Sequence, residues 1–140
     1  MKYIEDVDLG DEFGPIQIEV KPDDVIDFCK TWIREEENSK NIFNAAPTRF
    51  TDEEFAKSEG LPGAIVPGIM SMAYLARLLN TAWPNGTITQ LDVVFRQLVL
   101  HNQIINLVGV VTDTVSEDTE NYIECDVYIE NNELKSYMPF

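Results

Sequence analysis

The chain has 140 residues, of which 44% are hydrophobic and 10% aromatic, and this composition fits one folded domain over residues 1–140. Twenty-five acidic residues against 10 Lys and Arg give a formal net charge of -15. Because phosphate binding needs clustered cations, this balance argues against nucleic acid as a main partner and against docking on anionic membranes.

Two elements are expected before residue 34. Ile16, Ile18 and Val20 alternate with polar residues, which predicts a half-buried strand. Pro22 begins a predicted helix, because proline suits the first helical position and acidic residues favour the positive end of a helix. The apolar face of this helix comprises Val25, Ile26, Phe28, Cys29, Trp32 and Ile33. The polar run that follows, residues 34–40, is expected to be a solvated helix end or loop.

Two further helices are expected in the middle of the chain. Thr51 and Glu54 have the spacing of a capping box, which predicts a short helix with Thr51 as its N-cap and an end at Gly60. Residues 65–80 are apolar on nearly every side, with Arg77 as the single charge, so this helix is expected to be buried all round. The stretch at 69–76 that lacks Pro, Gly and charge is too short to cross a membrane, which takes roughly 20 residues.

The rest of the chain reads as strands. After a turn at residues 83–86, strands are expected at 87–100, 104–115, 122–129 and 134–138, with short links and a further turn at Asn131 and Asn132. Consecutive strands with short links form an antiparallel sheet. The predicted fold class is therefore α+β, with an antiparallel sheet wrapped around one long buried helix.

The motif at residues 51–56 (TDEEFA), followed by 65–70 (IVPGIM), resembles the MaoC-like hydratase/dehydratase family, whose fold is the hot-dog fold. The family pattern is roughly N-P-x-H-x-D-x-x-F-A, then I-x-H-G-M a dozen residues later. Asp52, Phe55, Ala56, Ile65 and Gly68 match it in register. This resemblance implies hydration of 2-enoyl thioesters of coenzyme A, or the reverse dehydration.

The same register implies that the usual acid/base pair is missing. The family's catalytic Asp and His correspond to Ala45 and Phe50, and the His of its H-G motif corresponds to Pro67. The only histidine of the chain, His101, is interpreted as a turn residue. Whether the chain is an enzyme by itself is therefore left open. Asp52 is a possible displaced base, and the alternative is that it caps and charges a helix N-terminus.

The resemblance also implies a thioester-binding site at the start of the apolar helix. Pro67 has no N–H, so the Gly68 and Ile69 N–H groups are expected to lack helical acceptors and to hold the thioester oxygen. Phe50, Pro67 and Arg49 are the expected pocket residues. The alternative is that Pro67 and Gly68 only start a helix. Thioesterase chemistry is not supported, because residues 65–80 contain no acid.

Three functions remain open on this reading. The first is a non-catalytic or partner-dependent subunit of an enoyl-coenzyme A hydratase/dehydratase, paired as a homodimer or as a heterodimer with a catalytic MaoC-like chain. The second is an active (R)-specific hydratase or dehydratase with displaced acid/base residues. The third is a binding protein for a hydrophobic acyl ligand. Because the chain has a net charge of -15, it repels coenzyme A unless basic groups gather locally or on a partner.

No cofactor is expected, and no metal site either, because Cys29, Cys125 and His101 are far apart in the sequence. Both cysteines are expected to be buried, reduced thiols. The first ten residues, MKYIEDVDLG, lack the apolar stretch of a signal peptide, so a cytoplasmic location is expected.

Overall fold

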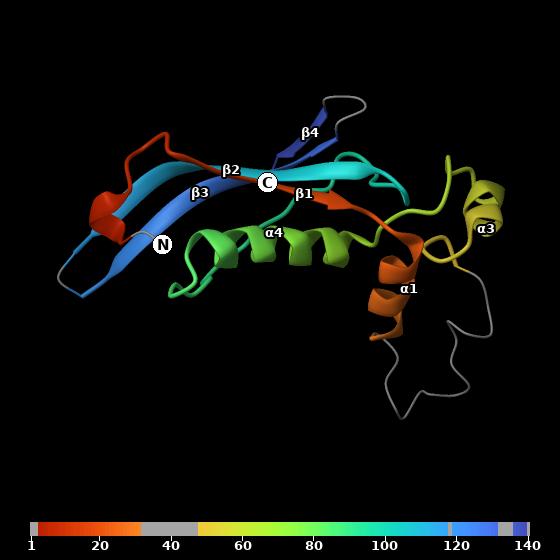
Figure 1. Ribbon diagram of the computed structural model, residues 1–140, viewed down its shortest axis with the longest axis horizontal. Helices are drawn as coiled ribbons and strands as arrows, with labels where there is room; N and C mark the ends of the chain where they lie inside the picture. The colour runs from red at the N-terminus through yellow and green to blue at the C-terminus, as the bar shows by residue number, and fades with distance from the viewer. Residues whose placement is uncertain (1–2, 32–47, 118, 132–135, 140) are drawn as a thin grey trace. The chain divides into compact units, whose positions relative to one another are not determined.

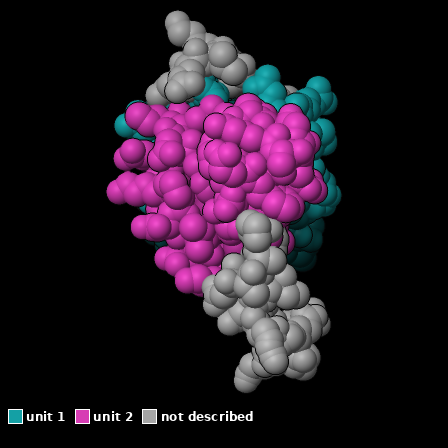
Figure 2. All heavy atoms as spheres, turned by 90° about the vertical axis from the view of Figure 1, so that its right-hand side faces the viewer, with its two compact units in different colours: residues 1–18, 72–97, 105–140 teal, residues 19–71, 98–104 magenta. Residues whose placement is uncertain are grey.

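The computed structural model describes residues 3–31, 48–117, 119–131 and 136–139 (Figure 1). These residues fall into two compact units, coloured separately in Figure 2. Unit 1 comprises residues 1–18, 72–97 and 105–140, and unit 2 comprises residues 19–71 and 98–104. The expectations for Trp32, Ile33, residues 34–40, Ala45 and the turn at Asn132 lie outside the described residues.

The sheet has four strands in the order β1-β2-β3-β4. Strand β2 (Ile104–Ser116) runs antiparallel to β3 (Asn121–Asn131), with Ile105 opposite Asn131 and Ser116 opposite Asn121. The register shifts between Val111 and Asp113, where one strand carries an extra residue. Strand β4 (Ser136–Pro139) pairs antiparallel with β3. The prediction of an antiparallel sheet is confirmed, and so are the strands expected at 104–115 and 122–129.

Strand β1 (Glu12–Glu19) follows the short 3-10 helix η1 (Ile4–Asp6) and confirms the strand expected around Ile16. Its alternation is as predicted, because Ile16 and Ile18 are half-buried while Gln17 and Glu19 are exposed. Val111 fixes the N-terminal end of β1 by two backbone hydrogen bonds. Its carbonyl accepts from Gly10 N–H at 2.9 Å, and its N–H donates to the Asp11 carbonyl at 2.8 Å.

Helix α4 (Gly68–Ala82) is the long apolar helix, and its residues 72–82 belong to unit 1. Leu75 and Leu78 are at most 1% exposed, and a Cβ added at Gly14 of β1 would lie 3.4 Å from Leu78 Cδ1. The helix is not buried all round as predicted. Ile69, Ala73, Arg77 and Asn80 are exposed, and this three-to-four-residue spacing marks one helical face. Only the other face is covered within the described chain. The helix also begins at Gly68 and not at Ile65, where it was predicted to begin.

The strand predicted at residues 87–100 is wrong for most of its length. Within the described residues this segment forms no hydrogen-bonded ladder, and only Leu100 makes an isolated antiparallel bridge, to Ile65. A β-prone segment becomes a strand only where another strand completes its hydrogen bonds. The turn before it is confirmed, because Gly86 N–H donates to the Trp83 carbonyl at 3.0 Å.

Unit 2 contains helix α1 (Pro22–Lys30) and helix α3 (Glu53–Ser58). Helix α1 begins at Pro22 as predicted, and Val25 and Cys29 on its apolar face are fully buried. Both cysteines are free; Cys29 is buried and Cys125 is half-buried. Burial raises the pKa of both thiols, and with the added charge of Asp126 the pKa of Cys125 reaches about 11.

Gly14 and Gly10 provide a matched test of the contact between β1 and β2. Both have positive φ, +90° and +87°, but a Cβ at Gly14 would lie 2.5 Å from the Leu107 carbonyl oxygen, whereas nothing lies within 4 Å at Gly10. We expect Gly10→Ala to lower the free energy of unfolding by about 1–2 kcal/mol, from φ strain alone. Gly14→Ala should lose a further 1–3 kcal/mol or so through overlap. Urea denaturation of both variants measures this difference, and equal losses would contradict the close contact.

Candidate functional site

The start of helix α4 presents two backbone donors. The carbonyl of Pro67, a fully buried residue, accepts from Met70 N–H at 2.9 Å and from Ser71 N–H at 3.2 Å, so Pro67 precedes the first helical turn. The next two N–H groups, those of Gly68 and Ile69, have no hydrogen-bond partner in the described part of the chain. Two such donors at the positive end of a 15-residue helix can hold an oxygen on which negative charge develops.

The three residues before Pro67 fix the position of this helix start within unit 2. Ile65 N–H donates to the Arg49 carbonyl at 3.1 Å, and Val66 N–H donates to the Val99 carbonyl at 2.8 Å. His101 N–H donates to the Ala64 carbonyl at 3.1 Å. Ala64, Ile65 and Val66 are all buried, so their backbone groups need these partners. The segment around Arg49 and the segment at 99–101 therefore lie on either side of residues 64–66.

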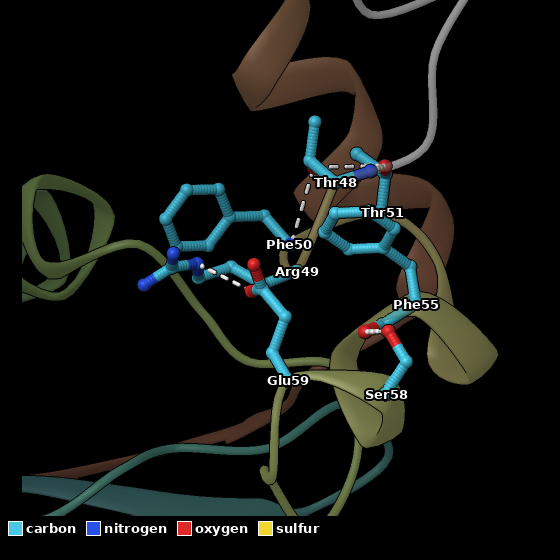
Figure 3. A network of polar contacts seen from close by, with 7 residues as sticks. All are labelled: Thr48, Arg49, Phe50, Thr51, Phe55, Ser58 and Glu59. Atoms are coloured by element: carbon cyan, nitrogen blue, oxygen red, sulfur yellow. Dashed lines mark hydrogen bonds and ion pairs between the residues drawn. The ribbon is translucent and has the colours of Figure 1, made fainter.

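Asp52 is the N-cap of helix α3, and the prediction that Thr51 caps it is wrong. Asp52 Oδ1 accepts from Phe55 N–H at 2.8 Å. Thr51 bonds backwards instead: its Oγ1 accepts from Thr48 N–H at 3.1 Å and lies 2.9 Å from Thr48 Oγ1 (Figure 3). Thr and Asp are both good N-cap residues, and the helix begins one residue later than the sequence pattern predicts. One oxygen of the candidate base is thus occupied by capping.

Arg49 and Phe50 lie just before this cap. Arg49 Nε is 3.0 Å from Glu59 Oε1, and Figure 3 shows the two side chains pointing toward each other. Their side chains are 52% and 33% exposed, so the ion pair adds little stability but lowers the net positive charge that Arg49 offers to an anion. Phe50 is half-buried, and its N–H donates to Thr48 Oγ1 at 3.2 Å. Ala45, the other expected position, is not among the described residues.

His101 is the residue that sequence reasoning placed outside the site. It lies in a turn as expected, but the fold brings it to the backbone of Phe50 and Ile65, both of which favour the charged imidazole. Burial outweighs these contacts and the attraction of Glu53, so the pKa of His101 is lowered. Its Nε2 is buried and has no hydrogen-bond partner among the residues described. The only feature of the sequence that could have indicated a role for His101 in the site is that it is the single histidine of the chain.

The described residues contain neither a candidate metal centre nor a helix that could span a membrane. Over residues 3–31, 48–117, 119–131 and 136–139, no three His, Cys, Asp or Glu side chains gather in a way that could hold an ion. The helices within these ranges are too short or too polar to cross a bilayer.

The open antiparallel sheet with one long helix is the hot-dog fold, as solved structures of the same architecture show. A MaoC-like dehydratase from Rhodospirillum rubrum is similar over 99% of this chain and 91% of its own, with a TM-score of 0.75 and 17% identity. The family model described as "MaoC like domain" matches residues 50–132. The chain therefore belongs to the MaoC-like family.

Two other solved structures are similar to this chain. An (R)-hydratase from A. caviae, described as involved in PHA biosynthesis, has a TM-score of 0.73 and 14% identity, covering 95% of this chain and 91% of that one. The ChsH1-ChsH2 complex from Mycobacterium tuberculosis has a TM-score of 0.69 and 12% identity, covering 95% and 92%. At these identities the likeness shows the fold. No curated protein matches the chain.

The lowered pKa of His101 gives a pH dependence of stability. The unfolded chain binds a proton at His101 near pH 6.5, whereas the half-buried imidazole of the folded chain binds it only at lower pH. Below about pH 6.5 the unfolded state therefore binds more protons, and stability falls until the pH is below the folded-state pKa. We expect the free energy of unfolding to drop more steeply for the wild type than for His101→Gln between about pH 6.5 and 5. Parallel pH profiles in urea denaturation would contradict the burial of this ring.

Proposed function

We propose that this chain is an acyl-thioester-binding subunit of a MaoC-like hydratase or dehydratase that lacks its own acid/base pair and depends on a partner chain for turnover. The observation that carries the proposal is the pair of N–H groups at Gly68 and Ile69 that have no partner among the described residues, and it is combined with the register that assigns Phe50 to the family's histidine position. The site can bind and polarise a thioester, but Phe50 has no group that moves a proton.

The chemistry of hydration explains how thioester binding and proton transfer can be divided between two chains. Adding water to a 2-enoyl thioester requires a base to deprotonate water at the β-carbon and an acid to protonate the α-carbon. Negative charge passes to the thioester oxygen between these steps, and backbone N–H groups stabilise it without titrating. Gly68 has no side chain to obstruct an approaching carbonyl, and the Ile69 side chain is exposed. Proton transfer must then come from another side chain or another chain.

Apolar exposure supports the expectation of a partner. Val94 and Phe95 are 52% and 49% exposed in a β-prone segment that has no strand assignment among the described residues, and Leu98, a few residues later, is 48% exposed. Such a segment gains hydrogen bonds and buries its side chains when a second sheet edge adds to it. The partner is a second copy or a catalytic MaoC-like chain. A partner with basic groups would also offset the charge of -15 that repels coenzyme A.

We expect the chain to be a dimer or higher assembly in solution. Val94→Lys with Phe95→Glu should weaken this assembly, because charges placed on an associating edge cost desolvation and disrupt apolar packing. Tyr3→Lys with Leu9→Glu is the matched control, since Tyr3 and Leu9 are also exposed and lie outside this segment. Light scattering at micromolar concentration measures the mass. A wild-type monomer, alone and with any MaoC-like chain encoded next to it, would contradict the proposal.

One observation favours a second candidate, an active hydratase with a displaced base. His101 is neutral at pH 7 because its pKa is lowered, and the fold holds it against the backbone of Phe50, which the sequence register assigns to the family's histidine position. Its buried Nε2 has no partner in the described chain and can accept a proton once a substrate opens access to it. Asp52 is less suited to this role because Oδ1 is engaged in capping α3.

Hydration of crotonyl-coenzyme A separates the candidates. For a partner-dependent subunit we expect the purified wild type to be nearly inactive, since losing an acid/base group costs about 100- to 10,000-fold. Ala45→Asp with Phe50→His should then create measurable activity that neither single variant has. If the wild type turns over rapidly instead, His101→Gln and Asp52→Asn identify the base.

Controls are needed because these side chains enter partly buried positions. Phe50→Leu is the matched control for Phe50→His, because it changes the ring without adding a titratable group. Thermal denaturation must show that the double variant folds, since an unpaired buried carboxylate is costly. A folded double variant that binds crotonyl-coenzyme A without turnover would contradict the register of Ala45 and Phe50. It would favour an acyl-binding protein without chemistry.

A further inference from the structure

The segment that leads into helix α4 is bound by a carboxylate from helix α3. Glu53 Oε1 accepts a hydrogen bond from Ala64 N–H at 3.1 Å, 11 positions further along the chain. The N–H groups of Ile65 and Val66 bond to backbone carbonyls instead. Glu53, Ala64 and Gly68 all belong to unit 2, which is magenta in Figure 2. A substitution at Glu53 therefore removes one bond of this segment and leaves its backbone bonds in place.

The bond joins an exposed residue to a buried one. Glu53 is exposed, whereas Ala64 is 2% exposed and Gly63 beside it is also buried. An exposed carboxylate that loses this bond is solvated by water, but a buried N–H that loses its acceptor carries the cost of its desolvation. Without the carboxylate, the lower-energy arrangement is one in which Ala64 moves until its N–H reaches another acceptor.

The absence of a side chain at Gly63 belongs to the same contact. A Cβ added at Gly63 would collide with Glu53 Oε2 and lie 3.2 Å from Glu53 Cδ. The φ angle of Gly63 lies outside the left-handed region, so the backbone itself does not require glycine here. The space that a larger residue needs is thus filled by the carboxyl group of Glu53.

Helix α3 gives Glu53 a fixed base for this contact. Ala56, in the middle of the helix, is fully buried, and its carbonyl accepts from Leu61 N–H at 3.1 Å. The loop between the helix and residue 64 is therefore attached to α3 at two points. One is the backbone of Ala56, and the other is the carboxylate of Glu53.

We infer that Glu53 is a positioning residue of the thioester site, which through Ala64 sets where the Gly68 and Ile69 N–H groups point. Ala64 lies four positions before Gly68, and the buried Pro67 between them has a fixed φ, so a shift of Ala64 is passed to the first turn of α4. An error of about 1 Å in such geometry can cost roughly 100-fold in rate. The inference rests on the proposed function, because the two donors need a fixed direction only if a thioester binds.

Proton–nitrogen correlation spectra of the full chain test the positioning without a ligand. Glu53→Ala removes the acceptor, and Glu53→Gln keeps an oxygen in its place. Glu54→Ala is the matched control, because Glu54 is an exposed acid in the same first turn of α3. We expect Glu53→Ala to shift the Gly68 and Ile69 amide signals and to speed deuterium exchange at Ala64, and the other two variants to stay near the wild type. Unmoved Gly68 and Ile69 signals in a folded Glu53→Ala variant would overturn the inference.

Gly63→Ala reaches the same contact from the other side, and it takes the place of Glu53→Ala if that variant does not fold. Its added Cβ displaces the Glu53 carboxyl group, so it should move the same two amide signals. When both substitutions are combined, the signals should lie close to those of Glu53→Ala alone, because the bond is already absent. Additive shifts would show that the two residues act independently and would contradict the inference.

The carbonyl stretch of a bound thioester distinguishes a failure of this inference from a failure of the proposed function. The probe is crotonyl-coenzyme A with carbon-13 in its carbonyl, observed by infrared difference spectroscopy. We expect the wild type to lower the stretching frequency, and Glu53→Ala to lose most of this lowering and to bind about 3- to 10-fold more weakly. Glu53→Gln should restore both.

Two outcomes of the infrared measurement count against these expectations, and they differ. An unchanged frequency on the wild type would contradict the proposed function and the thioester role of Glu53 together. An equal lowering on the wild type and on Glu53→Ala would overturn the inference and leave the proposed function standing.

Discussion

The candidate site depends on the backbone hydrogen bonds of Ala64, Ile65 and Val66. These residues are buried immediately before a helix whose first N–H groups must stay unpaired if they are to serve a ligand. A buried backbone that is itself unpaired would be unstable, so the segment bonds to Arg49 on one side and to Val99 and His101 on the other. The donors at Gly68 and Ile69 thus follow a segment in which the N–H groups of residues 64–66 and the carbonyl of Ala64 are satisfied.

Much of the fold could be predicted from local pattern. The alternation in β1, the proline at the start of α1 and the apolar length of α4 each follow from short-range chemistry. The errors occur where the outcome depends on a distant neighbour. Residues 87–100 have strand composition, but within the described chain only Val99 and Leu100 pair with another segment, residues 65 and 66, and no strand ladder forms. Thr51 and Asp52 are both suitable caps, and only the path of the incoming chain selects Asp52.

The candidate site was predictable only in part, for the same reason. The start of the long helix is a local signal: Pro67 cannot donate, and Gly68 and Ile69 follow it. The position of His101 beside Phe50 is not a local signal, because the two are 51 positions apart and the pairing of residues 99–101 with residues 64–66 brings them together.

The two thiols have a practical consequence for studying this protein. Cys29 is buried in α1, and the pKa of Cys125 in β3 is about 11, so both sulfurs stay protonated at neutral pH. Because the thiolate is the reactive species, maleimides and other alkylating reagents should attack them slowly. A cysteine introduced at an exposed position such as Ala73 can then be labelled with a spin or fluorescent probe without removing the natural cysteines. The native sequence is thus already suited to site-directed spectroscopy.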